Sequence, residues 1–252
     1  MATGVLVLCL GKATRLIPYI EEGGGAGAKE YEALIRFGFE TTTDDAEGER
    51  RGDPQPTSGL TAARVAEALT AFVGPILQTP PAYSAKKIEG ERAYALARRG
   101  EKVALEPVRV EVGASDLLDL SEAGARVRFA CSRGTYIRAL ARDLGRALGV
   151  GAHLAELRRT RSGTSTIATA IPLHELQPES MDKRLLPMAE ILTTWQMVVV
   201  DDLQAADLRL GRAVTPTRAG EPSGRIRVCD RSGALVALAT ANGARLQPLC
   251  VF

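Results

Sequence analysis

The feature that most constrains this fold is a strongly amphipathic helix predicted to begin at Thr135. Apolar residues recur at helical spacing along one face, namely Ile137, Leu140, Ala141, Leu144 and Leu148. Arginines recur at i, i+4 and i+8 on the opposite face, namely Arg138, Arg142 and Arg146. We expect Arg142 and Arg146 to be solvated, because charged residues on the polar face of a helix usually meet water.

Two segments of the chain alternate between apolar and charged residues, which is typical of half-exposed strands. They cover residues 108–112 and 127–131. Further strands are predicted at 4–10, 29–37, 163–171 and 198–200. Further helices are predicted at 61–72, 92–99 and 186–193, together with one that Asp201 or Asp202 caps and Gly211 ends. A hairpin is predicted from 225–229 and 235–240, and Asn242-Gly243 is a second turn signal.

These elements predict a two-domain chain of the α/β (α+β) class. Residues 1–182 are expected to form a mixed, largely antiparallel sheet with flanking helices. Residues 183–252 are expected to form a small, β-rich domain. The 252 residues, 45% of them hydrophobic, suffice for a sizeable core.

Charge and cysteine content exclude several classes of function. The 32 basic and 30 acidic residues leave a net charge of only +2, so nucleic-acid binding would require basic residues gathered on one face. The four cysteines form no CxxC pair and the two histidines have no ligand cluster near them, so we expect no metal site. Without a signal peptide or an apolar run of the roughly 20 residues that a membrane span needs, we expect a cytoplasmic protein.

Four segments of the chain carry sequence motifs, and they are more specific together than any one of them is alone. The first segments are Ala2-Thr3-Gly4 with Cys9–Arg15, and Lys29-Glu30-Tyr31 with Arg36-Phe37-Gly38 and Thr41–Gly48. The later ones are Pro80–Lys87 with Gly90 and Tyr94, and Cys131–Arg138 with Asp143-Leu144-Gly145, Gly151-Ala152-His153 and Leu157-Arg158-Arg159.

In this order and at this spacing, the motifs resemble the bacterial tRNA pseudouridine synthases that modify uridine 55 of the T-loop. The resemblance covers essentially the whole chain, and its tail is similar to the PUA-like RNA-binding module of that family. It implies a cofactor-free isomerisation. The family cuts the bond between uracil N1 and ribose C1′, turns the base and rejoins it through C5, with an aspartate as nucleophile. The target base must first leave the stack.

The nucleophilic aspartate of the family stands in an Asp-Pro-x-Ala-Thr-Gly segment, and Met1 occupies the x position here. The aspartate would therefore precede Met1. We expect the sequence to be an N-terminally truncated version of the enzyme, from a misassigned start codon or a shortened gene, and to be inactive as written.

The resemblance implies five supporting residues of the active site. Tyr31 matches the tyrosine that stacks on the uracil, and Arg138 matches the arginine that pairs with the aspartate. Tyr136 and Leu157 match pocket residues, although ordinary core packing explains them nearly as well. Asp45 matches a polar residue of the site; its alternative is an Asx-turn in a Thr/Asp-rich stretch.

The expected partner is the T-stem-loop of tRNA, bound by a monomer. The residues expected to contact RNA are Tyr83, Ser84, Lys86, Arg133, Arg158 and Arg159. The four basic residues among them belong to three basic stretches, whose members are Lys86, Lys87, Arg92, Arg98 and Arg99, then Arg133, Arg142 and Arg146, then Arg158, Arg159 and Arg161. Lysine and arginine supply the phosphate contacts that RNA binding needs, although about half of these residues are expected only to be solvated.

One alternative is a non-catalytic tRNA-binding or tRNA-folding protein derived from the same family. A hydrolase or transferase that uses Asp45 as its acid is a weaker alternative, since no second carboxylate or histidine stands at a suitable spacing.

Overall fold

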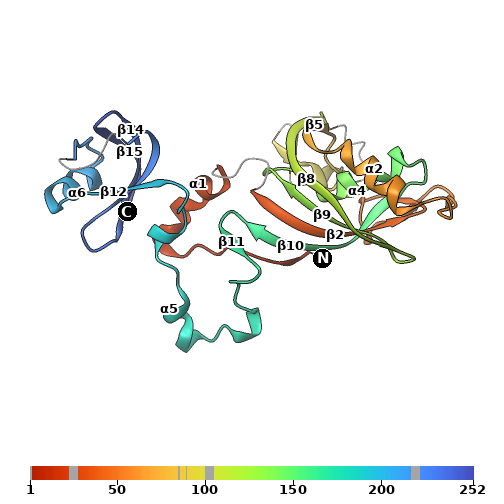
Figure 1. Cartoon of the computed structure of the whole chain (residues 1–252), viewed down its shortest axis with the longest axis horizontal. Coiled ribbons are helices and arrows are strands. Elements are labelled where there is room, and N and C mark those ends of the chain that lie inside the picture. Colours follow the sequence, from red (N-terminus) through yellow and green to blue (C-terminus); the bar gives the residue numbers. More distant parts are fainter. Residues whose placement is uncertain (1, 23–27, 85, 89, 100–104, 217–221) are drawn as a thin grey trace. The chain divides into compact units, whose positions relative to one another are not determined.

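The fold consists of two compact units in a computed structural model of the chain (Figure 1). One unit comprises Met1–Leu6 with Gly24–Thr169, and the other comprises Val7–Gly23 with Ala170–Phe252. The domain boundary predicted at residue 182 therefore lies inside the second unit. The structure describes residues 2–22, 28–84, 86–88, 90–99, 105–216 and 222–252.

A mixed sheet organises the first unit. Its strands run in the order β1-β10-β2-β9-β8-β5, and β11 pairs with β10. Their bounds are β1 Thr3–Gly4, β10 Ala152–Ser162, β2 Lys29–Phe37, β9 Gly124–Cys131, β8 Val108–Ser121, β5 Gly74–Gln78 and β11 Ser165–Thr166. β1 runs parallel to β10, and the other neighbouring strands of the sheet are antiparallel. The predicted mixed, largely antiparallel sheet is confirmed.

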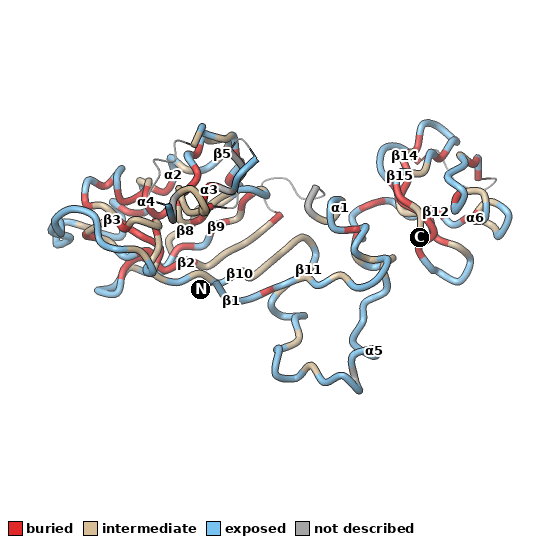
Figure 2. The backbone as a smooth tube through the Cα atoms, turned by 180° about the vertical axis from the view of Figure 1, so that it is seen from behind, coloured by how far each residue is buried: buried red, intermediate tan, exposed pale blue. Residues whose placement is uncertain are grey.

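Two helices supply the apolar side chains that cover this sheet. α2 (Ala62–Thr70) begins at Thr61, whose side chain caps it as predicted, and α4 (Ile137–Ala147) carries the predicted apolar stripe. The stripe packs with Phe129 of β9 in one core cluster, which Figure 2 shows as the buried part of the unit. The remaining short elements are β3 Glu40–Thr41, β4 Arg50–Arg51, β6 Lys87–Ile88, β7 Glu91–Arg92 and α3 Ala93–Arg98.

The second unit has a four-stranded sheet of its own, which confirms the predicted β-rich C-terminal domain. The strands, in their order in the sheet, are β12 Gln196–Val199, β13 Gly224–Cys229, β14 Leu235–Asn242 and β15 Arg245–Val251. α6 (Asp202–Arg209) begins at Asp201, which forms a capping box with Gln204. The unit also contains η1 Gly11–Leu16, α1 Ile17–Glu22, η2 Leu173–Glu175, η3 Pro178–Ser180, α5 Met181–Arg184 and η4 Met188–Glu190.

Three predicted elements are wrong. Residues 4–10 do not form a strand: β1 stops at Gly4, and the leucines beyond it are 53–69% exposed. Residues 163–171 contain only the two-residue β11, because the long strand of this region is β10, before it. Residues 186–193 form the short 3₁₀ helix η4 after Pro187 rather than an α-helix.

Two classes of feature are missing from the described residues. They contain no helix long and apolar enough to cross a bilayer. Within the same ranges, no three His, Cys, Asp or Glu side chains are grouped in a way that could hold a metal ion.

His153 is the buried histidine of the first unit. It lies near the start of β10, it is 3% exposed, and its Nδ1 lies 3.2 Å from the carbonyl oxygen of Phe39. Its ring also packs on the ring of Phe39, with 4.6 Å between centroids. Burial lowers the pKa of His153 below the ordinary 6.5, so the folded protein keeps this imidazole neutral.

We predict that His153 makes folding stability depend on pH between 7 and 5. The unfolded chain takes up a proton at the ordinary pKa of histidine and the folded chain does not, so stability is full above that pKa and falls as the pH drops. The melting temperature should therefore decline from pH 7 to pH 5, and His153→Gln should flatten that decline. His174→Gln is the control, because His174 is exposed; an unchanged decline in His153→Gln would contradict the prediction.

Candidate active site

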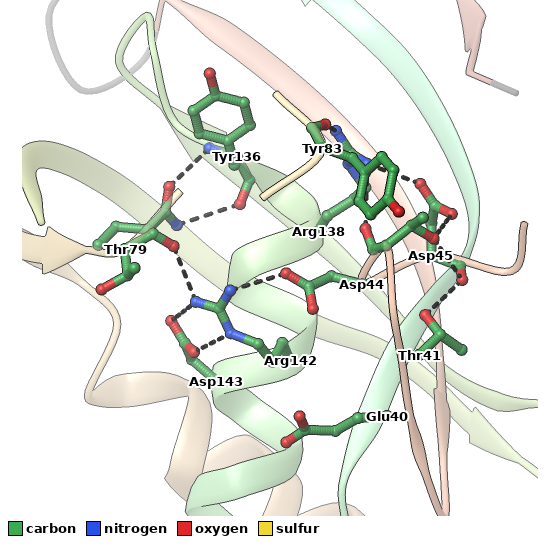
Figure 3. Close-up of polar contacts among 12 residues, drawn as sticks. Glu40, Thr41, Asp44, Asp45, Thr79, Tyr83, Tyr136, Arg138, Arg142 and Asp143 are labelled. Carbon is green, nitrogen blue, oxygen red and sulfur yellow. Dashed lines mark hydrogen bonds and ion pairs between the residues drawn. The ribbon is translucent and has the colours of Figure 1, made fainter. Parts of the chain in front are cut away.

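Three arginines of α4 each bind an acid from residues 40–45, so ion pairs line the polar face of this helix. The pairs are Arg138–Asp45, Arg142–Asp44 and Arg146–Glu40, with N–O distances of 3.0, 2.8 and 2.6 Å. Figure 3 shows the pairs of Arg138 and Arg142. The i, i+4, i+8 spacing that predicted a common face is what brings the three arginines over one segment of chain.

The expectation of solvation is wrong for Arg142 but confirmed for Arg146, whose side chain is 55% exposed. Arg142 is only 7% exposed, because the 40–45 segment and the carbonyl of Thr79 cover it. It is therefore not part of an RNA-binding face. Arg146 is more open, but both Nε and Nη2 donate to Glu40, and this bond holds the pKa of Glu40 below its ordinary value.

Arg138 ties two segments to α4. Its Nη1 donates to Oδ2 of Asp45 at 3.0 Å and to the carbonyl of Thr43 at 3.1 Å. Its Nη2 donates to the carbonyl of Tyr83 at 2.8 Å. The side chain is a quarter exposed, so the pair is half-buried and its electrostatic attraction is screened less than that of a surface pair.

Asp45 accepts hydrogen bonds at both of its carboxylate oxygens. Its Oδ1 accepts from Oγ1 of Thr43 at 2.5 Å and from the backbone N–H of Glu47 at 3.1 Å. The second of these bonds is the Asx-turn that the sequence allowed as an alternative. The turn aims Oδ2 of Asp45 at Arg138, and the role of Asp45 in the site stays a prediction.

Asp44 occupies the left-handed region of backbone space, with φ of 61°. Its carbonyl accepts from the N–H of Leu154 at 3.0 Å, and the N–H of Ala46 donates to the carbonyl of Leu154 at 3.0 Å. These bonds hold the turn to β10. Burial raises the pKa of Asp44, and the guanidinium of Arg142 opposes that rise.

Tyr31 and Leu157 lie on the face of the sheet that α4 covers. Tyr31 pairs with Arg159 across β2 and β10, and Leu157 stands two residues before Arg159, so both point to the same side. Both pack against the core cluster that includes Leu140. Burial raises the pKa of Tyr31, and Arg159, which hydrogen-bonds the phenol, opposes this; the phenol keeps its proton at neutral pH.

The first described residues run along the same part of β10. Gly4 pairs with Arg159, and a Cβ on Gly4 would stand 2.1 Å from the carbonyl oxygen of Arg159. With φ of +94° as well, the position requires glycine. Nε of Arg159 donates to the carbonyl of Val5 at 2.7 Å. Arg159 is therefore bound to the protein on two sides.

Tyr136 is the N-cap residue of α4, and a buried glutamine holds its backbone. Oε1 of Gln78 accepts from the Tyr136 N–H at 2.8 Å, and Nε2 of Gln78 donates to the Tyr136 carbonyl at 3.2 Å. Gln78 is 1% exposed. The sequence analysis missed this residue, and its one signal was an amide directly before Thr79-Pro80-Pro81.

The residues expected to contact RNA differ in exposure. Arg133 and Arg158 are exposed and form no ion pair with a described residue. Lys86 is partly exposed, and its Nζ donates to the carbonyl of Glu106. Tyr83 is half-buried. Ser84 is 3% exposed, and its Oγ has no hydrogen-bond partner among the described residues.

The wider basic stretches are largely paired. Arg99 binds Glu91 and Arg161 lies 3.8 Å from Glu30. The side chains of Lys87, Arg92 and Arg98 lie outside the described part of the chain. Among the described arginines of these stretches, Arg99, Arg142, Arg146 and Arg161 each have an acidic partner.

We predict that Gln78→Leu lowers the free energy of unfolding by about 1–3 kcal/mol, because it leaves a buried backbone N–H and C=O of Tyr136 without partners. Urea unfolding of the purified chain measures this. Gln55→Leu is the control, since Gln55 is exposed and bonds only its own turn. Equal free energies of unfolding for the two variants would contradict the clamp, meaning the two hydrogen bonds by which Gln78 holds the backbone of Tyr136.

Comparison with known families covers the whole chain in three consecutive matches. Residues 1–137 match the TruB family pseudouridylate synthase (N terminal domain), and residues 138–193 match the tRNA pseudouridylate synthase B C-terminal domain. Residues 195–252 match the tRNA Pseudouridine synthase II, C terminal, domain.

Individual relatives agree with these matches. The tRNA pseudouridine synthase B of Solibacter usitatus is 42% identical over 94% of this chain and 82% of its own length. Those of Leifsonia xyli and Corynebacterium diphtheriae are 41% and 38% identical over all of this chain and 84% and 83% of theirs.

Solved structures show the same fold. The structure entitled "Crystal Structure of a Cbf5-Nop10-Gar1 Complex" contains a chain that matches 96% of this one with a TM-score of 0.67 and 28% identity, over 67% of its own length. "Structure of H/ACA RNP bound to a substrate RNA containing 2'-deoxyuridine" matches 96% of this chain and 70% of its own, with a TM-score of 0.65 and 24% identity. The chain belongs to the TruB family of pseudouridine synthases.

Proposed function

We propose that this site recognises uridine 55 in the T-loop of tRNA and serves its isomerisation to pseudouridine. The observation that carries the proposal is the half-buried Arg138–Asp45 pair at the start of α4, in a chain of the TruB family. Relatives at 38–42% identity are named tRNA pseudouridine synthase B, which supports tRNA as the substrate.

The reaction is an internal rearrangement of one nucleotide. The N1–C1′ bond of uridine breaks, a C5–C1′ bond forms, and the proton of C5 is lost while N1 gains one. Atoms and electrons balance without an oxidant or a second substrate, so we propose that no cofactor or metal takes part. The base has to leave its stack to present C1′ and C5 to side chains.

Tyr31 is suited to act on the base. Its ring offers a flat apolar surface for stacking, and its phenol, held protonated by burial, can exchange a proton with a bound base through a hydrogen bond. Leu157 lies on the same side of the sheet and offers an apolar wall. Tyr136 stands at the N-terminus of α4, where the Gln78 clamp fixes its backbone.

A nucleophile needs a carboxylate oxygen with a free lone pair aimed at C1′. Both carboxylates beside Arg138 and Arg142 are held by the protein: Asp45 accepts three hydrogen bonds, and Asp44 is buried against Arg142. Nε of Arg138, in contrast, has no acceptor among the described residues. We therefore propose that a further carboxylate must join Arg138 before this site turns over.

We predict that the 252-residue chain makes no pseudouridine in a T-stem-loop RNA. A chain extended by Asp-Pro directly ahead of Met1 should gain activity, because that aspartate would enter beside β1. Digestion of the RNA to nucleosides after incubation, with chromatographic separation of pseudouridine from uridine, which has the same mass, measures both. A chain extended by Asn-Pro is the matched control and should stay inactive, at least about 10³-fold below the Asp-Pro chain.

Turnover by the 252-residue chain that Asp45→Ala abolishes would contradict this assignment and make Asp45 the nucleophile. Inactivity of the Asp-Pro chain, with tRNA binding intact, would favour the second candidate, a tRNA-binding protein without catalysis. The observation that favours this second candidate is that both oxygens of Asp45 already accept hydrogen bonds.

We also propose that the chain binds the T-stem-loop as a monomer in the cytoplasm. Binding should weaken steeply with salt, because phosphate contacts release counterions. We predict that Arg133→Ala with Arg158→Ala makes the slope of log K against log salt shallower by roughly 1–2, since both side chains are exposed.

Fluorescence titration of a labelled T-stem-loop at several salt concentrations measures this slope. Arg128→Ala is the control, because Arg128 is also exposed but binds Asp116 at 2.9 Å. Equal slopes for the double variant and the wild-type chain would argue against this basic surface.

A further inference from the structure

A second ion pair, Asp44–Arg142, lies one helical turn from Arg138–Asp45 and is more deeply buried. The side chains of Asp44 and Arg142 are 9% and 8% exposed, compared with 24% and 25% for Asp45 and Arg138. Burying such a pair costs more desolvation free energy than forming a surface pair, so the pair by itself adds little to folding stability. Its position suggests another use.

The guanidinium of Arg142 donates four hydrogen bonds to its neighbours. Nη1 donates to Oδ2 of Asp44 at 2.8 Å, and Nε and Nη2 donate to the two oxygens of Asp143 at 2.8 and 3.2 Å. Nη2 also donates to the carbonyl of Thr79 at 2.9 Å. Arg142 therefore joins α4 to the 44–45 turn and to the segment before Pro80.

The two pairs are in register. Asp44 and Asp45 are adjacent, and Arg138 and Arg142 are one turn of α4 apart, so any shift of the turn disturbs both bonds together. The same holds for the other segment, because Arg142 binds the carbonyl of Thr79 and Arg138 binds that of Tyr83. Figure 3 shows the two guanidinium groups between these segments.

The backbone conformation of Asp44 also has to be stabilised by contacts with other residues. Its φ of 61° is unfavourable for a residue with a Cβ, and Asn and Asp are the side chains that tolerate it best after Gly. Such a conformation persists where its surroundings determine it. In the structure it is held by the ion pair with Arg142, by the bond from Leu154 N–H to Asp44 O and by the bond from Asp44 N–H to Thr41 O.

We propose that Asp44 and Arg142 are positioning residues, which fix the Arg138–Asp45 pair by holding the 43–45 turn and the Thr79–Tyr83 segment against α4. This inference rests on the proposed function for the role of Arg138. Its test does not depend on the proposed function. Asp44 and Arg142 do not touch the reacting nucleotide in this account; they act through Asp45 and Arg138.

The test reads the conformation of Arg138 rather than turnover. In the 252-residue chain, ¹⁵N NMR of the arginine side chains should show separate Nη signals for Arg138, because three hydrogen bonds restrain its rotation. In Arg142→Met these signals should broaden or merge, and the backbone amide of Ala46 should exchange with solvent roughly tenfold faster. Arg146→Met is the matched control, since it removes the exposed pair one turn further along α4.

Two variants of Asp44 cover the case in which Arg142→Met does not fold. Asp44→Gly accepts the positive φ but removes the pair, so it should loosen Arg138 as Arg142→Met does. Asp44→Asn keeps both the preferred conformation and an acceptor oxygen, so it should preserve the Arg138 signals. Failure of the proposed function alone would leave all of these results unchanged, because none depends on catalysis.

Restrained Arg138 signals in Arg142→Met or Asp44→Gly would overturn the inference and leave Asp44–Arg142 as a pair with only local effect. Loss of the signals in Arg146→Met to the same degree would overturn it as well, since any pair on this face of α4 would then suffice.

Discussion

The ion pairs on the polar face of α4 are the interactions on which the rest of the site depends. The opposite face of α4 is buried in the core against the sheet, so the position of the helix is set by apolar packing. The arginines at i, i+4 and i+8 then face away from the core and meet the 40–45 segment and the carbonyls of Thr79 and Tyr83. Because the core is close-packed and rigid, α4 holds its charged side chains in fixed positions. Loops alone rarely achieve this.

The sheet contributes the other half of the site. β10 lies between β1 and β2, so it places Leu157 and Arg159 beside both Gly4 and Tyr31. The close approach at Gly4 excludes any side chain there, and Arg159 of β10 lies between Gly4 and the tyrosine proposed to stack on uracil. Asp44 and Ala46 bond to Leu154 of the same strand, so β10 connects the sheet to the acids that the arginines of α4 bind.

Much of this architecture follows from local pattern, and the failures have physical causes. The α4 stripe, the strands at Val127–Cys131 and the capping of α6 were predictable because periodicity and cap chemistry are properties of neighbouring residues. β10 was missed because a register shift between Leu154 and Glu156 breaks its alternation and because much of its second half is charged. Residues 4–10 form a continuous apolar run like that of a buried strand, but an apolar run does not say whether a neighbouring strand exists. The burial of Arg142 likewise depends on two distant segments, which no helical periodicity reveals. Tyr31, Asp45 and Arg138 were selected through motif resemblance, and their roles stay predictions.

The most direct test of the central claim is a crystal structure of the 252-residue chain bound to a T-stem-loop RNA. The account predicts that uridine 55 leaves its stack, lies with its base against the ring of Tyr31, and places C1′ beside the Arg138–Asp45 pair with that pair unbroken. An RNA bound with uridine 55 still stacked, or with its sugar away from Arg138, would contradict the assignment of this site.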